Sequence, residues 1–144
     1  MNTKEMMKVF GECELDGEKI IIKNKLHETI EYAKSLSYVM LKSITAVDLS
    51  DGFIELIYTL YSFENEENLI ISIKTNSEAA SITDIFPSAK ADENEIYDLF
   101  GIYFLNNDDL KRLYMPENWD GYPLRKDYIQ NDTRIAWNDD EGNS

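Results

Sequence analysis

The sequence predicts a single mixed domain in which helices accompany a sheet that contains an antiparallel hairpin. Three observations predict it. The 144 residues fit one domain that can bury a core. Apolar, β-branched stretches flank the turn signal at 50–52. Two other segments repeat apolar residues at helical spacing.

The first elements are a short hairpin, a helix and a strand. Gly17 supplies a turn within 11–23, which reads as a hairpin or a strand. An amphipathic helix is expected over 25–37, because Leu26, Ile30, Ala33 and Leu36 recur at helical spacing. A strand rich in β-branched residues follows over 38–49.

Two further strands are expected at 53–63 and 69–75, separated by a polar break. The even positions of the first, Ile54, Leu56, Tyr58 and Leu60, form an apolar face for the core. Its odd positions are also largely apolar, which fits either a central strand placed between two layers or a face covered by a partner. The central position is the favoured explanation.

Two helices are expected next. Ser77 or Ser81 caps a short helix that stops before Pro87. A second helix begins near Asp92, with Glu93 and Glu95 at its positive end. Gly101 is placed to end it in a left-handed cap, although the apolar spacing also allows a continuation to Tyr103. The chain is loop-like from residue 106.

Composition excludes several classes of function. The net charge of −14 is spread evenly over residues 1–92 and 93–144. This argues against nucleic acid or an anionic membrane as direct partners. The single cysteine, Cys13, permits no internal disulfide. The sequence shows neither a signal core nor an apolar run that spans a bilayer, so we expect a cytoplasmic protein.

A search for chemistry finds little. His27 and Cys13 lie in no catalytic motif, and no glycine-rich phosphate loop occurs. Glu95 and Asp98 share a helical face without a histidine to complete a metal site. Residues 106–109 resemble a calcium loop but lack its glycine and terminal glutamate, so a solvated turn or helix cap is preferred.

The C-terminal third has a distinct composition. All three arginines and both tryptophans lie at or beyond Arg112. These residue types are enriched at the energetic centres of protein interfaces. Arg125 either pairs with Glu93 or Glu95 of the same chain or docks on another protein, and both can hold at once.

Three spaced motifs carry a family resemblance. They are Glu93-x-Glu95-x-Tyr97-Asp98-Leu99-Phe100-Gly101-Ile102, Asp109-Leu110-x-Arg112, and Trp119-x-Gly121-x-Pro123-Leu124-Arg125-Lys126-Asp127-Tyr128. With Ile44–Asp48, the 56–63 stretch and Ser81–Phe86 upstream, they resemble the 30 kDa subunit family of NADH:quinone oxidoreductase, the NADH dehydrogenase of the respiratory chain known as complex I. Related subunits occur in energy-converting membrane-bound nickel–iron hydrogenases. The match covers residues 29–128.

The resemblance implies an α+β two-layer fold: a mixed or antiparallel sheet of about four to five strands with helices on one face, over residues 1–105. An extended docking segment and acidic tail follow over 106–144. Two departures, Asn94 for an arginine and Asn107-Asp108 for a histidine–proline pair, weaken the case for a standard respiratory complex, and the corresponding subunit of a hydrogenase is the alternative.

The resemblance also implies a role in assembly. We expect a non-catalytic, cofactor-free subunit of the peripheral arm, at the cytoplasmic face of the membrane, that docks on the large catalytic-core subunit (the complex I 49 kDa or hydrogenase large-subunit type) beside other peripheral-arm subunits. Iron–sulfur clusters, quinone or a nickel–iron centre are expected in those partners. A homo-oligomer of the isolated chain is compatible with this expectation. A stand-alone binding module is the lower alternative.

The expected docking residues all come from the three motifs. They are Glu93, Glu95, Tyr97, Asp98, Phe100, Gly101, Arg112, Trp119, Gly121, Pro123, Leu124, Arg125, Lys126, Asp127 and Tyr128.

Overall fold

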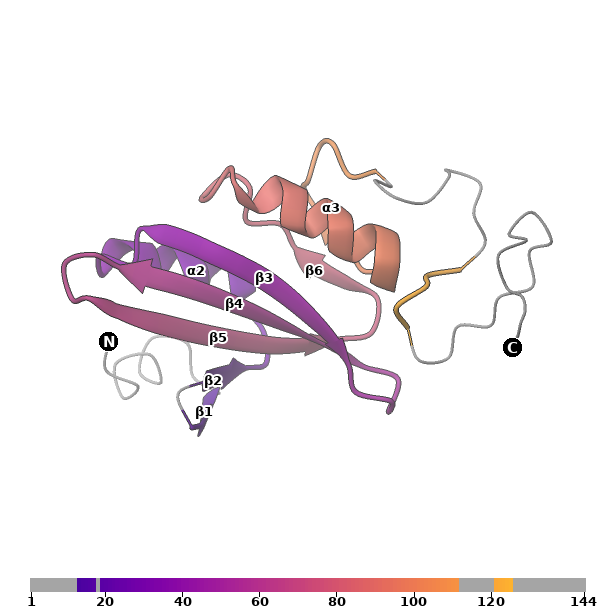
Figure 1. Cartoon of the computed structure of the whole chain (residues 1–144), viewed down its shortest axis with the longest axis horizontal. Helices are drawn as coiled ribbons and strands as arrows, with labels where there is room; N and C mark the ends of the chain where they lie inside the picture. Colours follow the sequence, from indigo (N-terminus) through magenta and orange to yellow (C-terminus); the bar gives the residue numbers. More distant parts are fainter. Residues whose placement is uncertain (1–12, 18, 112–120, 126–144) are drawn as a thin grey trace, which may run out of the picture.

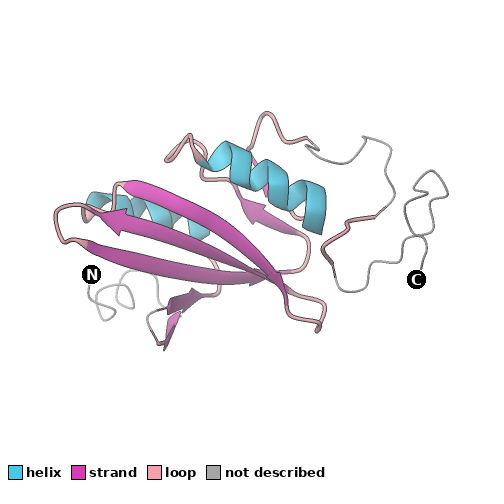
Figure 2. Cartoon of the chain, viewed as in Figure 1, coloured by secondary structure: helices cyan, strands magenta, loops and turns pink. Residues whose placement is uncertain are grey.

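The structure is a computed structural model that describes residues 13–17, 19–111 and 121–125. Figures 1 and 2 show a long twisted sheet with helices beside it. In chain order the elements are β1 (Cys13–Asp16), β2 (Lys19–Ile22), α2 (Leu26–Ser35), β3 (Met40–Asp48), β4 (Ile54–Ser62), β5 (Glu67–Thr75), β6 (Glu78–Ala80), α3 (Ala89–Phe100) and β7 (Tyr103–Leu105).

Among the described residues, the main sheet has five strands in the order β1-β2-β5-β4-β3. The pair β2–β5 is parallel, and the other neighbours are antiparallel. A second, two-stranded sheet joins β6 to β7 in parallel. The expected α+β fold with a mixed sheet of four to five strands is confirmed.

The core lies between one face of the main sheet and the helices. All four even positions of β4, predicted to face the core, are fully buried. Ile30 and Ala33 of α2 and Ile96 of α3 belong to the same apolar cluster. Both helices therefore cover the face of the sheet that carries the even side chains of β4.

The other face of β4 is only partly covered. Within the sheet β4 lies between β3 and β5, but this position does not cover its odd face, so the predicted placement between two layers is not confirmed. Ile57 and Tyr61 are half-buried, whereas Phe53 and Phe63, just outside the strand, are 41% and 64% exposed. Glu55 is buried on this face, where it accepts hydrogen bonds from Lys19 at 2.7 Å and from Ser72 at 2.5 Å.

The expected short helix before Pro87 is wrong. Residues 78–80 form β6, and residues 83–85 form a turn. The Ser81 side chain caps no helix; it donates a hydrogen bond to the Glu93 carboxylate, 2.7 Å away. The backbone of this segment instead hydrogen-bonds to β7, and the Ser81 amide donates to the Leu105 carbonyl at 2.8 Å.

Helix α3, which carries the first of the three family motifs, differs from expectation at both ends. It begins at Ala89, so Glu93 and Glu95 lie in its second turn rather than at its N-terminus. It ends at Phe100, and Gly101 takes the predicted left-handed cap (φ 79°). Tyr103 starts β7, which excludes the alternative of a helix continued to that residue.

The outer edge of the main sheet is covered by this helix. β3 is an edge strand, and α3 packs along it (Figure 1). The Asp92 carboxylate accepts a hydrogen bond from the outward-facing Ile44 amide at 3.0 Å. The helix thus satisfies a backbone donor that the edge would otherwise leave unpaired.

Candidate functional site

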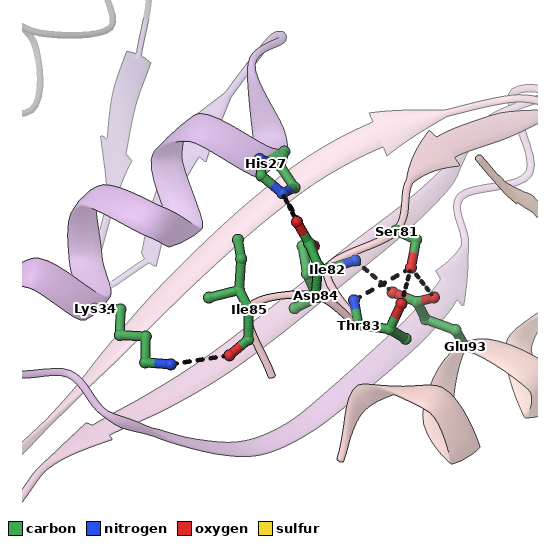
Figure 3. Close-up of polar contacts among 8 residues, drawn as sticks. All are labelled: His27, Lys34, Ser81, Ile82, Thr83, Asp84, Ile85 and Glu93. Carbon is green, nitrogen blue, oxygen red and sulfur yellow. Dashed lines mark hydrogen bonds and ion pairs between the residues drawn. The ribbon is translucent and has the colours of Figure 1, made fainter. Parts of the chain in front are cut away.

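Glu93, the first residue of the family motifs, connects α3 to other segments through buried hydrogen bonds. Glu93 is fully buried. One carboxylate oxygen accepts hydrogen bonds from the Ser81 hydroxyl (2.7 Å) and the Asn107 amide nitrogen (2.9 Å), and the other accepts one from the Ile82 amide (2.9 Å). Figure 3 shows the Ser81 and Ile82 contacts on the loop that follows β6. Glu93 therefore joins three segments that are distant in sequence.

The environment of this carboxyl group has electrostatic consequences. Burial raises the pKa of Glu93, although its three hydrogen-bond donors act in the opposite direction. Burial also raises the pKa of Tyr58 on β4, and the nearby charge of Glu93 adds to this. Burial thus disfavours a negative charge on either of these two side chains.

The loop held by Glu93 is also attached to α2. His27 contacts the Asp84 carboxylate at 2.8 Å, and Lys34 donates a hydrogen bond to the Ile85 carbonyl at 3.0 Å (Figure 3). The hydrogen bond from His27 lowers the pKa of Asp84. His27 is therefore a surface partner of a structural loop, and its contacts among the described residues form no catalytic arrangement.

The segment 121–125 packs on the C-terminal end of α3. The Leu124 amide donates to the Leu99 carbonyl (2.9 Å), and the Arg125 guanidinium donates to the Phe100 carbonyl (2.9 Å). A cation at this position complements the negative end of the helix dipole. Arg125 does close the tail back on the helix, but through a terminal carbonyl rather than through Glu93 or Glu95.

Gly101 makes this closure possible. Its positive φ favours glycine, and a Cβ at this position would lie 2.6 Å from the Tyr122 ring. The Tyr122 ring also lies near that of Tyr97, with 6.4 Å between centroids. The absence of a side chain at residue 101 therefore lets an aromatic ring cover the end of α3.

An apolar, aromatic surface surrounds this junction. Tyr97 makes edge-on contact with Tyr103 (6.4 Å between centroids) as well as its contact with Tyr122. Tyr103, Leu105 and Leu124 are 51%, 39% and 52% exposed. We call these five residues the Tyr97 patch. Exposed aromatic and aliphatic side chains gathered around a rigid helix end are typical of a protein-docking surface.

A shallow groove continues from this patch between α3 and β3. It encloses roughly 280 Å³, and the side chain of Leu124 forms part of its wall. Thr45 and Ala46 line it from β3, and Glu95 and Leu99 line it from α3. The exposed Glu95 gives the groove an acidic rim.

The structure brings most of the described docking candidates to one helix end, but in two different roles. Tyr97, Gly101, Pro123, Leu124 and Arg125 gather at the surface of the junction. Glu95 lies on the exposed side of α3, and Gly121 begins the packed segment with a φ of 96°.

Three other candidates lie inside the fold. Glu93 and Asp98 are fully buried, and Phe100 is 9% exposed. Direct contact of Glu93 with a partner is therefore incompatible with its position, because its carboxylate is used within the chain. Arg112, Trp119, Lys126, Asp127 and Tyr128 lie outside the described residues.

Sequence reasoning missed four residues of this region. Ser81 and Asn107 hold Glu93, and Tyr103 and Tyr122 build the Tyr97 patch. The expected turn at 106–109 is present, but Asn107 is buried rather than solvated, and its side chain also accepts a bond from the Asp109 amide at 3.0 Å. The tyrosines were detectable, since they flank the two glycines of the signature.

The described part of the chain contains no cluster of three or more histidine, cysteine or acidic side chains arranged to hold a metal ion. Within the same residues, no helix has the length and apolarity to cross a membrane. Burial raises the pKa of the Cys13 thiol, which disfavours the reactive thiolate.

Comparison with known proteins gives a consistent family. Residues 20–134 match the model of the respiratory-chain NADH dehydrogenase 30 kDa subunit. The chain is 38% identical over 100 residues to an NADH-quinone oxidoreductase subunit of Geotalea uraniireducens, covering 66% of this chain and 61% of that protein. It is 35% identical over 109 residues to a longer NADH-quinone oxidoreductase subunit of Phocaeicola vulgatus, covering 72% of this chain and 21% of that protein.

A mitochondrial relative and a solved structure extend the comparison. The NADH-ubiquinone oxidoreductase 30.4 kDa subunit of Neurospora crassa is 36% identical over 105 residues, which are 69% of this chain and 36% of that protein. A chain of the membrane-bound sulfane sulfur reductase, an archaeal respiratory membrane complex, shares the fold (TM-score 0.74, 23% identity, 94% of this chain and 85% of that chain).

This chain spans less than two thirds of the length of each of these curated relatives. The matched residues nevertheless include α3, β7 and the 121–125 segment that forms the junction. The chain belongs to the family of the respiratory-chain NADH dehydrogenase 30 kDa subunit.

Proposed function

We propose that this protein is a subunit of the peripheral arm of a complex I-type membrane-bound oxidoreductase, where it docks on the large catalytic-core subunit. The names of its relatives support membership of such an assembly. The observation that carries the docking role is the Tyr97 patch, which exposes apolar and aromatic side chains at the C-terminal end of a helix whose second turn is anchored in the interior by Glu93. A pre-ordered surface loses little conformational entropy on binding.

In this proposal the chain contributes architecture rather than chemistry. Iron–sulfur clusters, quinone or a nickel–iron centre belong to the partner subunits, and this chain holds no redox group and does not turn over substrate alone. Its place is the cytoplasmic face of the membrane, through contact with those subunits. The excess of acidic residues supports protein partners over nucleic acid or anionic lipid.

An energy-converting nickel–iron hydrogenase is the second candidate for the assembly. The departures from the family motif at Asn94 and Asn107 weaken the case for a standard respiratory complex and leave this alternative open. Asn107 supplies the donor to Glu93 that this fold needs, so that departure is accommodated without loss of the internal network. Mass spectrometry of the partners that co-purify with the tagged native subunit separates the two, since a nickel–iron large subunit occurs only in the hydrogenase.

Two lysine substitutions test the docking role. Tyr103→Lys and Leu124→Lys each place a charge in the Tyr97 patch, and the control Val47→Lys places one at another exposed apolar position on β3 (40% exposed). We expect both patch variants to fold but to lose co-purification with the large subunit, and the control to keep it. Unchanged recovery of the large subunit with both patch variants would show that the patch is not the docking surface.

A further inference from the structure

A second exposed apolar cluster lies at the opposite end of the main sheet. It consists of Val39, Met40, Tyr61 and Phe63, and we call it the Phe63 patch. Val39, Met40 and Phe63 are 51%, 44% and 64% exposed. Met40 pairs with Tyr61 across β3 and β4, and the Phe63 ring contacts that of Tyr61 edge-on at 5.0 Å between centroids.

This patch is spatially separate from the Tyr97 patch. Figure 1 shows the β4–β5 turn at the left end of the sheet and the C-terminal end of α3 at the right. Along β3, Met40 is five positions before Thr45 in the groove beside Leu124, a span of about 17 Å at the rise of a β-strand. A partner segment that fills one surface therefore leaves the other accessible.

The charge around the Phe63 patch is predominantly negative. Glu64 and Glu66 are exposed in the turn directly after Phe63. Lys42, a cation near the patch, lies over the Tyr61 ring at 5.8 Å and donates to the Asn68 side chain at 3.3 Å. Electrostatic complementarity therefore favours a basic partner and disfavours an anionic membrane surface.

The turn that carries these glutamates is fixed in place. The Ser62 hydroxyl accepts a hydrogen bond from the Asn65 amide at 3.0 Å, and the Asn65 side chain donates to Ser37 at 3.2 Å. On the other side of the turn, the Tyr38 hydroxyl donates to Glu67 at 2.6 Å. An apolar ring and an acidic turn held by such contacts form a pre-organised surface.

We propose that the Phe63 patch is a second protein-docking surface, which takes a basic segment of another polypeptide in the same assembly. The segment presents an apolar side chain to Met40 and Phe63, and flanking lysine or arginine side chains to Glu64 and Glu66. The inference rests on the proposed function only in that this chain works within a multi-subunit assembly. It makes the subunit a bridge between two partner segments.

Site-specific photo-crosslinking in the purified native assembly tests the bridge. A photoreactive benzoylphenylalanine replaces Phe63 in one strain and Tyr103 in another, and the linked peptides are sequenced. We expect position 63 to capture a peptide with lysine or arginine within a few residues of the link, from a different polypeptide or segment than position 103 captures.

Charge variants sharpen the test. The double change Glu64→Lys and Glu66→Lys is expected to lower the crosslinking yield at position 63 several-fold, as is a rise in salt concentration, because both weaken contacts between exposed charges. The matched double change Glu14→Lys and Asp16→Lys alters two exposed acids on β1 and should leave the yield unchanged.

The outcomes separate this inference from the proposed function. Capture at position 63 of lipid only, of a second copy of this chain, of a peptide without basic residues, or of nothing overturns the second surface. Failure at position 103 with basic-peptide capture at position 63 overturns the Tyr97 docking surface and retains the second one. Failure at both positions overturns both.

Discussion

Glu93 and Glu95 are two residues apart on α3, yet the first carboxylate is fully buried and the second is exposed. The same contrast recurs further along α3, where Asp98 is buried and Tyr97 contributes to the exposed Tyr97 patch. Residues of one sequence motif therefore serve either the fold or its surface, and their role depends on which side of the helix they occupy.

The largest expected effect follows from removing the buried carboxylate. Glu93→Ala leaves a hydroxyl, a backbone amide and a side-chain amide without their acceptor, so we expect a loss of about 3–5 kcal/mol in the free energy of unfolding. Glu95→Ala, the control on the same helix, should change it by less than about 0.5 kcal/mol. Urea unfolding followed by circular dichroism measures both. Equal unfolding midpoints for the two variants would contradict the assignment of a structural role to Glu93 and a surface position to Glu95.

The junction at Gly101 should give the next largest effect. Gly101→Ala places a side chain in a left-handed conformation and into the Tyr122 ring, whereas Gly52→Ala (φ 92°) meets open space. The conformational strain alone costs about 1–2 kcal/mol. We expect the Gly101 variant to lose more stability than the Gly52 variant, and the difference reports the packing of the 121–125 segment on α3. If the two losses are the same, that packing contributes nothing to stability.

A smaller effect distinguishes two buried glutamates by pH. The pKa of Glu93 is raised, mainly by burial, so its ionisation favours the unfolded state and the stability it contributes is lost as pH rises above the ordinary value of 4.5. At Glu55 burial also acts upward, but hydrogen bonds from Lys19 and Ser72 outweigh it and lower the pKa. The stability that Glu55 contributes is therefore lost as pH falls through and below 4.5.

Stability measured against pH for the wild type, Glu93→Gln and Glu55→Gln checks this contrast. The advantage of the wild type over Glu93→Gln should shrink as pH rises above 4.5, and its advantage over Glu55→Gln should shrink as pH falls below that value. Differences that move in the same direction for both variants would contradict the assigned environments.

The smallest effect on stability is expected at the surface. Leu124→Ser removes an apolar side chain that is 52% exposed, so the free energy of unfolding should change by less than about 0.5 kcal/mol. The companion change Leu99→Ser alters a residue packed against the core and should destabilise clearly more. Thermal melts of the two proteins give the comparison. A large loss at Leu124 would place that residue with the fold rather than with the docking surface.

The elements that sequence reasoning located well are those with local signals. The hairpin β3–β4, β5 and α2 follow from alternation, a turn signal and helical spacing, each contained in a short stretch. The pair β6–β7 was not predictable in this way, since three-residue parallel strands joined across α3 leave no local pattern. The serines before Pro87 resemble helix caps locally, but residues 78–80 pair instead with residues far along the chain.

The candidate site shows the same division. Gly101 was correctly read as a left-handed cap, because that feature depends on one residue. The burial of Glu93 depends on donors from two other segments, which no periodicity reveals, so a glutamate that ends up in the core was expected at a docking surface. The resemblance of spaced motifs identified the family, but it could not divide their residues between interior and surface.

The hydrogen bond from the Ile44 amide to Asp92 has a consequence for the synthesis of this chain. Until α3 has folded onto β3, the nine-residue edge strand presents backbone groups that another chain can pair with. A ribosome must therefore release residues well beyond β5 before the sheet is protected against self-association. Packing of α3, with Asp92 bonded to the Ile44 amide, therefore protects this edge against misassembly only late in synthesis. A chain cut off before Ala89 should precipitate under conditions in which the full chain stays dissolved.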